Sequence, residues 1–187
     1  MSGHQQSPPA VGHQANSWLY ANIWIGQLKI PHIASPPFQL LLISWVCFLC
    51  PGLFNALGGL GGVGQSNLRP ADNSLTALYA TFCWFGVFSG TVTNMLGVKL
   101  TIFVGTIGYW IFSLSFLTYN YIHSDTFVIV AGAILGFCAG LLWCAQAVVM
   151  ISYPPELSKG KYIAWFWAIF NFGGVLGAAV CSYIYCF

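Results

Sequence analysis

Charge is what this sequence has least of. Only 4% of its 187 residues are Asp, Glu, Lys or Arg, whereas 58% are hydrophobic and the mean hydropathy is +0.77. A soluble domain of this length needs many more charged side chains to cover its surface, so the composition indicates an integral membrane protein. The five basic residues are scattered and form no patch, and we therefore expect no nucleic-acid partner.

Several functional signatures are also missing. All acids, bases and histidines lie outside the apolar runs, so the runs hold no titratable group of the kind that proton-coupled transporters use. The sequence has no GxxxxGK[ST] loop for an ATP-driven pump, no nucleophile–base pair and no metal-binding cluster. The seven cysteines all fall inside apolar runs, where they are typical packing residues. We therefore expect no enzyme, and no catalytic residue, metal or cofactor.

Five apolar runs follow one another along the chain. Each is long enough, at about 1.5 Å per residue, to cross a bilayer core of about 30 Å as a helix. The sequence therefore predicts an all-α membrane protein whose transmembrane bundle covers residues 38–187 and is embedded in a lipid bilayer. The runs cover about residues 38–60, 75–96, 100–121, 127–151 and 162–186.

Two segments precede the first run. Residues 1–17 are polar and rich in Pro, Gln and Gly, which is typical of a disordered tail. Residues 18–37 mix aromatic side chains with Lys29 and several prolines, and we expect them to lie at the membrane interface. Within the first run, Pro51 and Gly52 predict a kink, which neighbouring helices in a bundle can tolerate.

The link between the second and third runs sets the predicted orientation. Gly97 interrupts the apolar sequence and Lys99 follows it, which predicts a hairpin joined by three or four residues. Short cytoplasmic loops are enriched in Lys and Arg. Four of the five bases fall on the Lys99 side, and only Arg69 lies on the other, in a predicted outer loop over residues 65–74. The N-terminus is therefore predicted to be cytoplasmic.

Glycines recur at a spacing of four residues, which places them on one face of a helix. They form an uninterrupted row of three in the fourth run and a pair in the fifth. Such small residues let two helices approach closely, so we expect helix packing at these positions. The residues are Gly132, Gly136, Gly140, Gly173 and Gly177.

The link after the second run also resembles the corresponding loop of major facilitator superfamily transporters. Gly90, Gly97 and Lys99 fall on glycine and basic positions of that loop, whereas Asn94 stands where the pattern has Asp. The resemblance implies a transporter-like helix bundle. The lysines on this side of the predicted bundle either mark topology at the lipid headgroups or belong to a cytoplasmic gate in which Lys99 pairs with Glu156.

Three longer stretches resemble the uncoordinated-ninety-three family of ion channel regulatory proteins, a branch of that superfamily. They read SPPFQLLLISWVCFLCPGLFNALGGLGGVGQ at the first run, ALYATFCWFGVFSG at the second, and GAILGFCAGLLWCAQAVVMISYPPELSKGKYIAWFWAIFNFGGVLGA across the fourth and fifth. The resemblance covers residues 35 to about 180. It implies an architecture of roughly twelve spans, of which this chain corresponds to the first five.

This family resemblance implies two functions, a small-solute transporter or a non-transporting partner of a channel or receptor. In the first case, polar side chains within the spans are candidates for substrate binding, because such transporters bind ligands near the bilayer midplane. The alternative is that the amides hydrogen-bond between helices. A third possibility is a truncated product that is inactive alone, or that acts with a second half or as a homodimer. The candidate residues are Asn55, Trp143, Gln146 and Asn171.

Overall fold

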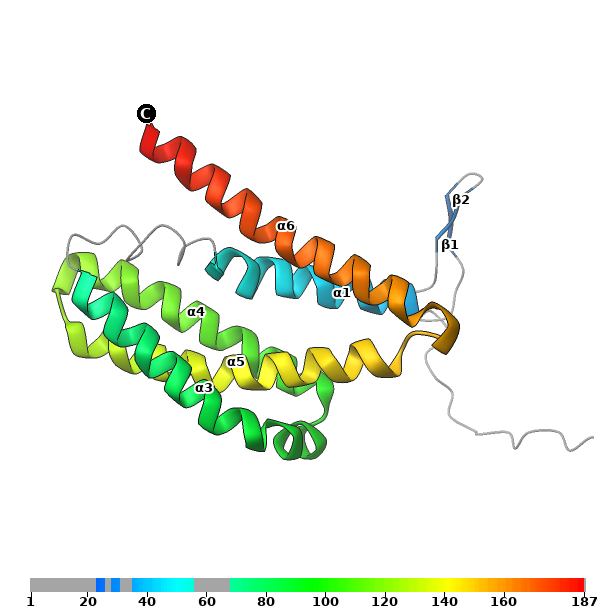
Figure 1. The fold of residues 1–187 in the computed structure, drawn as a ribbon, viewed down its shortest axis with the longest axis horizontal. Helices are drawn as coiled ribbons and strands as arrows, with labels where there is room; N and C mark the ends of the chain where they lie inside the picture. The colour runs from blue at the N-terminus through cyan, green and yellow to red at the C-terminus, as the bar shows by residue number, and fades with distance from the viewer. Residues whose placement is uncertain (1–22, 26–27, 31–34, 56–67, 187) are drawn as a thin grey trace, which may run out of the picture.

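In the part of the chain that the structure describes, five helices are long and apolar enough to cross a membrane, as the sequence predicts (Figure 1). The computed structural model describes residues 23–25, 28–30, 35–55 and 68–186. The all-α class and the multi-pass membrane character are therefore confirmed. The helices are α1 (Pro36–Cys47), which continues through a π-helical turn (Phe48–Gly52), α3 (Leu68–Leu96), α4 (Val98–Ile122), α5 (Asp125–Ser152) and α6 (Lys159–Cys186), with a short 3-10 turn (Glu156–Ser158) before α6.

The segment before α1 contains a small feature that the sequence analysis did not predict. Strands β1 (Ile23–Ile25) and β2 (Leu28–Ile30) pair in antiparallel fashion, with Trp24 opposite Lys29. Isoleucines and an aromatic residue favour such a strand pair. The predicted tail over residues 1–17 and the last part of the predicted first span lie outside the described residues.

Helix α3 begins earlier than the hydropathy predicts. We expected Arg69 and Asp72 in a loop, but both lie in the first turns of α3. Polar side chains there bond to the helix itself: the Ser74 hydroxyl donates to the Ala71 carbonyl at 2.7 Å, and the Thr76 hydroxyl to the Asp72 carbonyl at 2.9 Å. Hydropathy marks where apolar side chains begin, whereas a helix can extend beyond them.

One residue, Gly97, joins α3 to α4, so the expected link of three or four residues is wrong. Its backbone angles are φ +78° and ψ 153°, a region that only glycine enters readily. The Gly97 N–H donates to the Thr93 carbonyl at 2.9 Å, and its carbonyl accepts from the Thr101 N–H at 3.1 Å and the Thr101 hydroxyl at 2.9 Å. These bonds fix the reversal of the chain at this single residue.

Helix α5 packs between α3 and α4. On its α3 side, a Cβ added to Gly132 would overlap the Ser74 carbonyl oxygen, and one added to Gly136 would overlap the Leu78 carbonyl oxygen. The two helices are therefore in backbone contact at these glycines. Further along, a Cβ at Gly140 would lie 3.6 Å from the backbone nitrogen of Gly86, which is ordinary van der Waals contact.

On the α4 side of α5, the small residues belong to the neighbouring helix and not to α5. They are Gly105 and Gly108 of α4, which leave room for Cys138 and Leu142 of α5. Around this crossing lies a buried cluster that joins the three helices. Its largest aromatic members are Tyr109, Phe112, Phe116 and Tyr119 of α4.

Helices α1 and α6 form a second packed pair, which lies side by side in Figure 1. The π-helical turn touches α6 through its backbone: a Cβ at Gly173 would lie 2.9 Å from the Phe48 carbonyl oxygen, and one at Gly52 would lie 3.2 Å from the Phe170 carbonyl oxygen. Gly177 is half-buried on the same helix. A second buried cluster, which includes Ile43, Cys47, Phe166 and Phe170, holds this pair against the end of α5; the half-buried Trp143 contacts both clusters.

The α3–α5 contact yields a prediction. Gly136→Ala should destabilise the protein by about 1–3 kcal/mol, because the new methyl group meets backbone atoms of α3 that cannot move aside alone. Gly140→Ala is the matched control on the same face, where the methyl group has room. Thermal unfolding of the purified protein in detergent, followed by circular dichroism, measures both; equal melting temperatures for the two variants would contradict this packing.

Candidate functional site

The first span and helices α3, α4 and α5 line a cavity of about 100 Å³ that is open to the surface on one side, where Asn55 and Tyr79 are exposed. A space of this size holds a few water molecules or a small solute. It lies where the π-helical turn of the first span passes over the α3–α5 crossing. Its walls are formed by Pro51, Phe54, Asn55, Leu78, Tyr79, Phe82, Tyr109, Leu135, Ala139 and Trp143.

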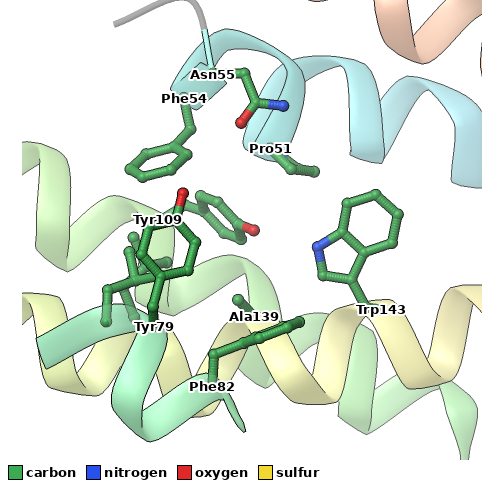
Figure 2. A pocket seen from close by; sticks show the side chains of 10 residues that line it. Pro51, Phe54, Asn55, Tyr79, Phe82, Tyr109, Ala139 and Trp143 are labelled. Carbon is green, nitrogen blue, oxygen red and sulfur yellow. The ribbon is translucent and has the colours of Figure 1, made fainter. Parts of the chain in front are cut away.

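Polar groups converge on this cavity from four elements (Figure 2). The Tyr109 hydroxyl points toward the indole nitrogen of Trp143, and the side chain of Asn55 lies on the opposite wall. Tyr109 is buried, whereas Tyr79 at the rim is exposed. Phenol hydroxyls, an amide and an indole N–H provide neutral donors and acceptors without a charge.

Pro51 accounts for the local geometry of the first span. Proline has no N–H to donate to the preceding turn, and its ring displaces the carbonyl that would accept there. The chain responds with the π-helical turn Phe48–Gly52, at the place where the sequence predicts an irregularity. Beyond it, the Phe54 ring packs edge-on against Tyr109 at 5.9 Å and Phe112 at 5.4 Å between ring centroids. These contacts hold Asn55 over the cavity.

The structure brings together two of the four predicted substrate-binding residues. Asn55 and Trp143 line the cavity, whereas Gln146 and Asn171 do not. Gln146 is buried within the bundle. Asn171 is exposed on α6, and its side-chain amide donates to the Trp167 carbonyl at 2.7 Å, one turn earlier on the same helix.

Trp143 also connects α5 to α6. Its ring stacks on Trp167 at a centroid distance of 6.2 Å and meets Phe170 edge-on at 5.5 Å. The face that we expected to be available to a ligand is thus partly used by α6, and the indole N–H side remains toward the cavity (Figure 2).

Two cavity residues, Tyr79 and Tyr109, were not predicted from the sequence. Tyrosine is common in apolar runs, so neither residue stands out as Asn and Gln do. The available signal was the pair of glycines at positions 105 and 108, which comes directly before Tyr109 and marks a close helix crossing.

The predicted cytoplasmic loop residues are spread over the α3–α4 hairpin. Gly90 lies within α3 with open space around it, Asn94 is exposed, and Gly97 forms the link. Lys99 is exposed at the start of α4.

The gate alternative would pair Glu156 with Lys99. In the structure Glu156, which lies in the 3-10 turn before α6, pairs instead with Lys159 at 2.7 Å, three residues further along the chain. An exposed pair of this kind contributes little stability.

Among the described residues, no group of three His, Cys, Asp or Glu side chains lies close enough to share a metal ion. The cavity is lined by uncharged groups. Its walls therefore offer hydrogen-bonding groups and aromatic surfaces without a charge.

Comparison with known proteins points to one family. Residues 71–187 match the family model described as ion channel regulatory protein UNC-93. An UNC93-like protein of Schizosaccharomyces pombe is 47% identical over 165 residues, which cover 88% of this chain and 33% of the relative. UNC93-like protein 1 of Arabidopsis thaliana is 51% identical over 146 residues, covering 78% of this chain and 32% of the relative.

A third relative, an uncharacterized membrane protein of Schizosaccharomyces pombe, is 32% identical over 150 residues, covering 79% of this chain and 31% of that protein. The chain spans about a third of the length of the curated relatives it matches. No solved structure matches the chain.

The cavity itself yields a prediction. Ala139→Leu places three carbon atoms into existing space, so the melting temperature should stay within a few degrees of the original. Ala145→Leu, at a fully buried position of α5 that does not line the cavity, should cost about 1–3 kcal/mol by overpacking. Calorimetry in detergent compares the two; a larger loss for Ala139→Leu would mean that the cavity cannot accept a side chain.

Proposed function

We propose that this chain, which belongs to the UNC-93 family of ion channel regulatory proteins, acts by binding a second membrane protein and regulating it. The family supports this proposal, one relative is a membrane protein by its name, and this chain itself has helices long and apolar enough to cross a membrane. The proposal for this chain depends on one residue, Asn171.

Asn171 lies near the midpoint of the 28-residue helix α6 and is exposed. At that depth an exposed side chain meets hydrocarbon, where an amide is costly unless a protein group bonds to it. One amide hydrogen is used by the Trp167 carbonyl. The side-chain oxygen accepts no bond in the described part of the chain, which favours a protein neighbour over lipid at this face.

The residues around Asn171 extend the same surface. Trp167 and Val175, one turn to either side, are both exposed, at 46% and 63% of their surface. We call these three residues the Asn171 face. Large aromatic side chains beside a polar group are typical of residues that contribute most to protein–protein contacts.

The separation of the polar side chains supports regulation over transport. A solute path across the bundle needs its polar groups in one connected space, but Gln146 and Asn171 lie away from the cavity that Asn55 lines. We propose further that the Lys99 end of the bundle is cytoplasmic, as the basic residues predict.

The proposed partner at the Asn171 face is another membrane protein. A second half or a second copy of this chain is the competing occupant.

Site-specific crosslinking tests the Asn171 face. A photoreactive amino acid at position 171, in cells that express the protein, should produce an adduct with another membrane protein, identified by mass spectrometry. The matched control carries the same group at Trp110, which is 73% exposed near the midpoint of α4. Equal adducts at both positions, or adducts to this chain alone at position 171, would overturn the proposed partner.

The crosslinked partner then allows a quantitative test. Asn171→Leu should weaken the complex by about 0.6–2 kcal/mol, the range for polar side chains between membrane helices. Trp110→Leu should leave the complex unchanged.

The cavity favours a second candidate function, the binding and passage of a small uncharged polar solute. Its support is the set of neutral donors on Asn55, Tyr109 and Trp143. Proteoliposomes would then swell faster than protein-free vesicles in an osmotic gradient of such a solute, and Ala139→Leu would abolish the difference. Swelling that survives Ala139→Leu would exclude this cavity as the route.

A further inference from the structure

A larger hollow lies at the other end of the bundle, between α1, α4 and α5. Its volume is about 280 Å³. We call it the Lys99 groove, after the charged residue in its wall. It is lined by Gln39, Leu42, Ile43, Val46, Val98, Lys99, Ile102, Val149 and Tyr153.

The Lys99 groove is polar at one end and apolar along the rest. Gln39 lies in the first turn of α1, Lys99 in the first turn of α4, and Tyr153 caps the end of α5. From these helix ends the groove continues to Val46 and Ile102. At a rise of about 1.5 Å per residue, Val46 lies roughly 10 Å beyond Gln39 along α1.

Lys99 has no carboxylate to pair with in the described part of the chain, which includes all three acids. Asp72 lies in the first turns of α3, 29 residues long, whereas Lys99 follows its far end. Asp125 begins α5, at the end away from Tyr153. Glu156 is held by Lys159. The Lys99 ammonium group is therefore a positive charge in the groove wall that no carboxylate of the described residues neutralises.

We propose that the Lys99 groove binds one anionic glycerophospholipid from the leaflet on its own side of the membrane. The net negative headgroup lies against the Lys99 ammonium group, and one acyl chain lies against Leu42, Val46 and Ile102. A lysine at the end of a helix reaches the headgroup level while its stem covers apolar surface, and anionic headgroups attract such a residue. A free phosphate would leave the apolar wall of the groove uncovered.

Native mass spectrometry of the whole chain in detergent tests this proposal. The protein is titrated with phosphatidylserine or with phosphatidylcholine of the same acyl chains, and the dissociation constant of the first bound lipid is measured. Phosphatidylserine should bind about fivefold more tightly, as expected for one lysine near an anionic headgroup. Lys99→Gln should remove this preference, and Lys99→Arg should retain it.

Lys161→Gln is the matched control, because it removes one exposed lysine of α6 that does not line the groove. It should leave the preference intact. Ile102→Trp, which fills the apolar part of the groove, should weaken the binding of both lipids. Circular dichroism of each variant checks that it is folded.

Three results would overturn the proposal. The first is an equal affinity of the original protein for both lipids. The second is a preference that survives Lys99→Gln or that is lost equally in Lys161→Gln, since the charge effect would then belong to the membrane surface in general. The third is displacement of the bound lipid by glycerophosphoserine, which carries the headgroup without acyl chains.

Discussion

The backbone contact between α3 and α5 is the constraint on which the rest of the bundle depends. In hydrocarbon, apolar side chains gain little by touching one another rather than lipid, so helices associate where small residues permit close approach. Gly132 and Gly136 bring α5 against the carbonyl groups of α3, and the glycines of α4 do the same on the opposite side. Because α5 supplies both contacts, α3 and α4 are positioned by α5 more than by each other. The cavity exists because the first span, with its π-helical turn, crosses this three-helix unit without filling the space beside Ala139.

The sequence predicts this fold well where one physical rule acts alone. The cost of charge in hydrocarbon reveals five spans, and the spacing of Gly132, Gly136 and Gly140 places them on the face where α5 meets α3. It predicts poorly where several helices combine. The extended start of α3, the single-residue link at Gly97 and the strand pair before α1 depend on backbone hydrogen bonds that hydropathy does not report. The resemblance to the uncoordinated-ninety-three family is confirmed, while the wider resemblance to the major facilitator superfamily stays a prediction.

The candidate site was predicted in part, and the reason lies in rotation about the helix axes. Asn55 and Trp143 reach the same cavity because the π-helical turn reorients the last turn of the first span. Gln146 follows Trp143 by three residues, yet the rotation that brings Trp143 beside Tyr109 leaves Gln146 among other buried side chains. Tyrosine and tryptophan contribute the polar groups that the cavity uses, although an apolar run contains them without any local signal. Conversely, the position of Asn171 in the sequence gave no indication that it faces outward.

The one-residue link at Gly97 also has a consequence for how the chain can vary. Helices α3 and α4 are separated only by Gly97, whose backbone is hydrogen-bonded to both helices, so their rotational phases are coupled across the turn. Inserting one residue would rotate α4 by about 100° about its axis and shift it by about 1.5 Å, carrying its glycines away from α5 and Lys99 out of its groove. An insertion at this point would therefore require helix α4 to repack against α5, whereas a longer link elsewhere in the chain would not change the phase of these two helices.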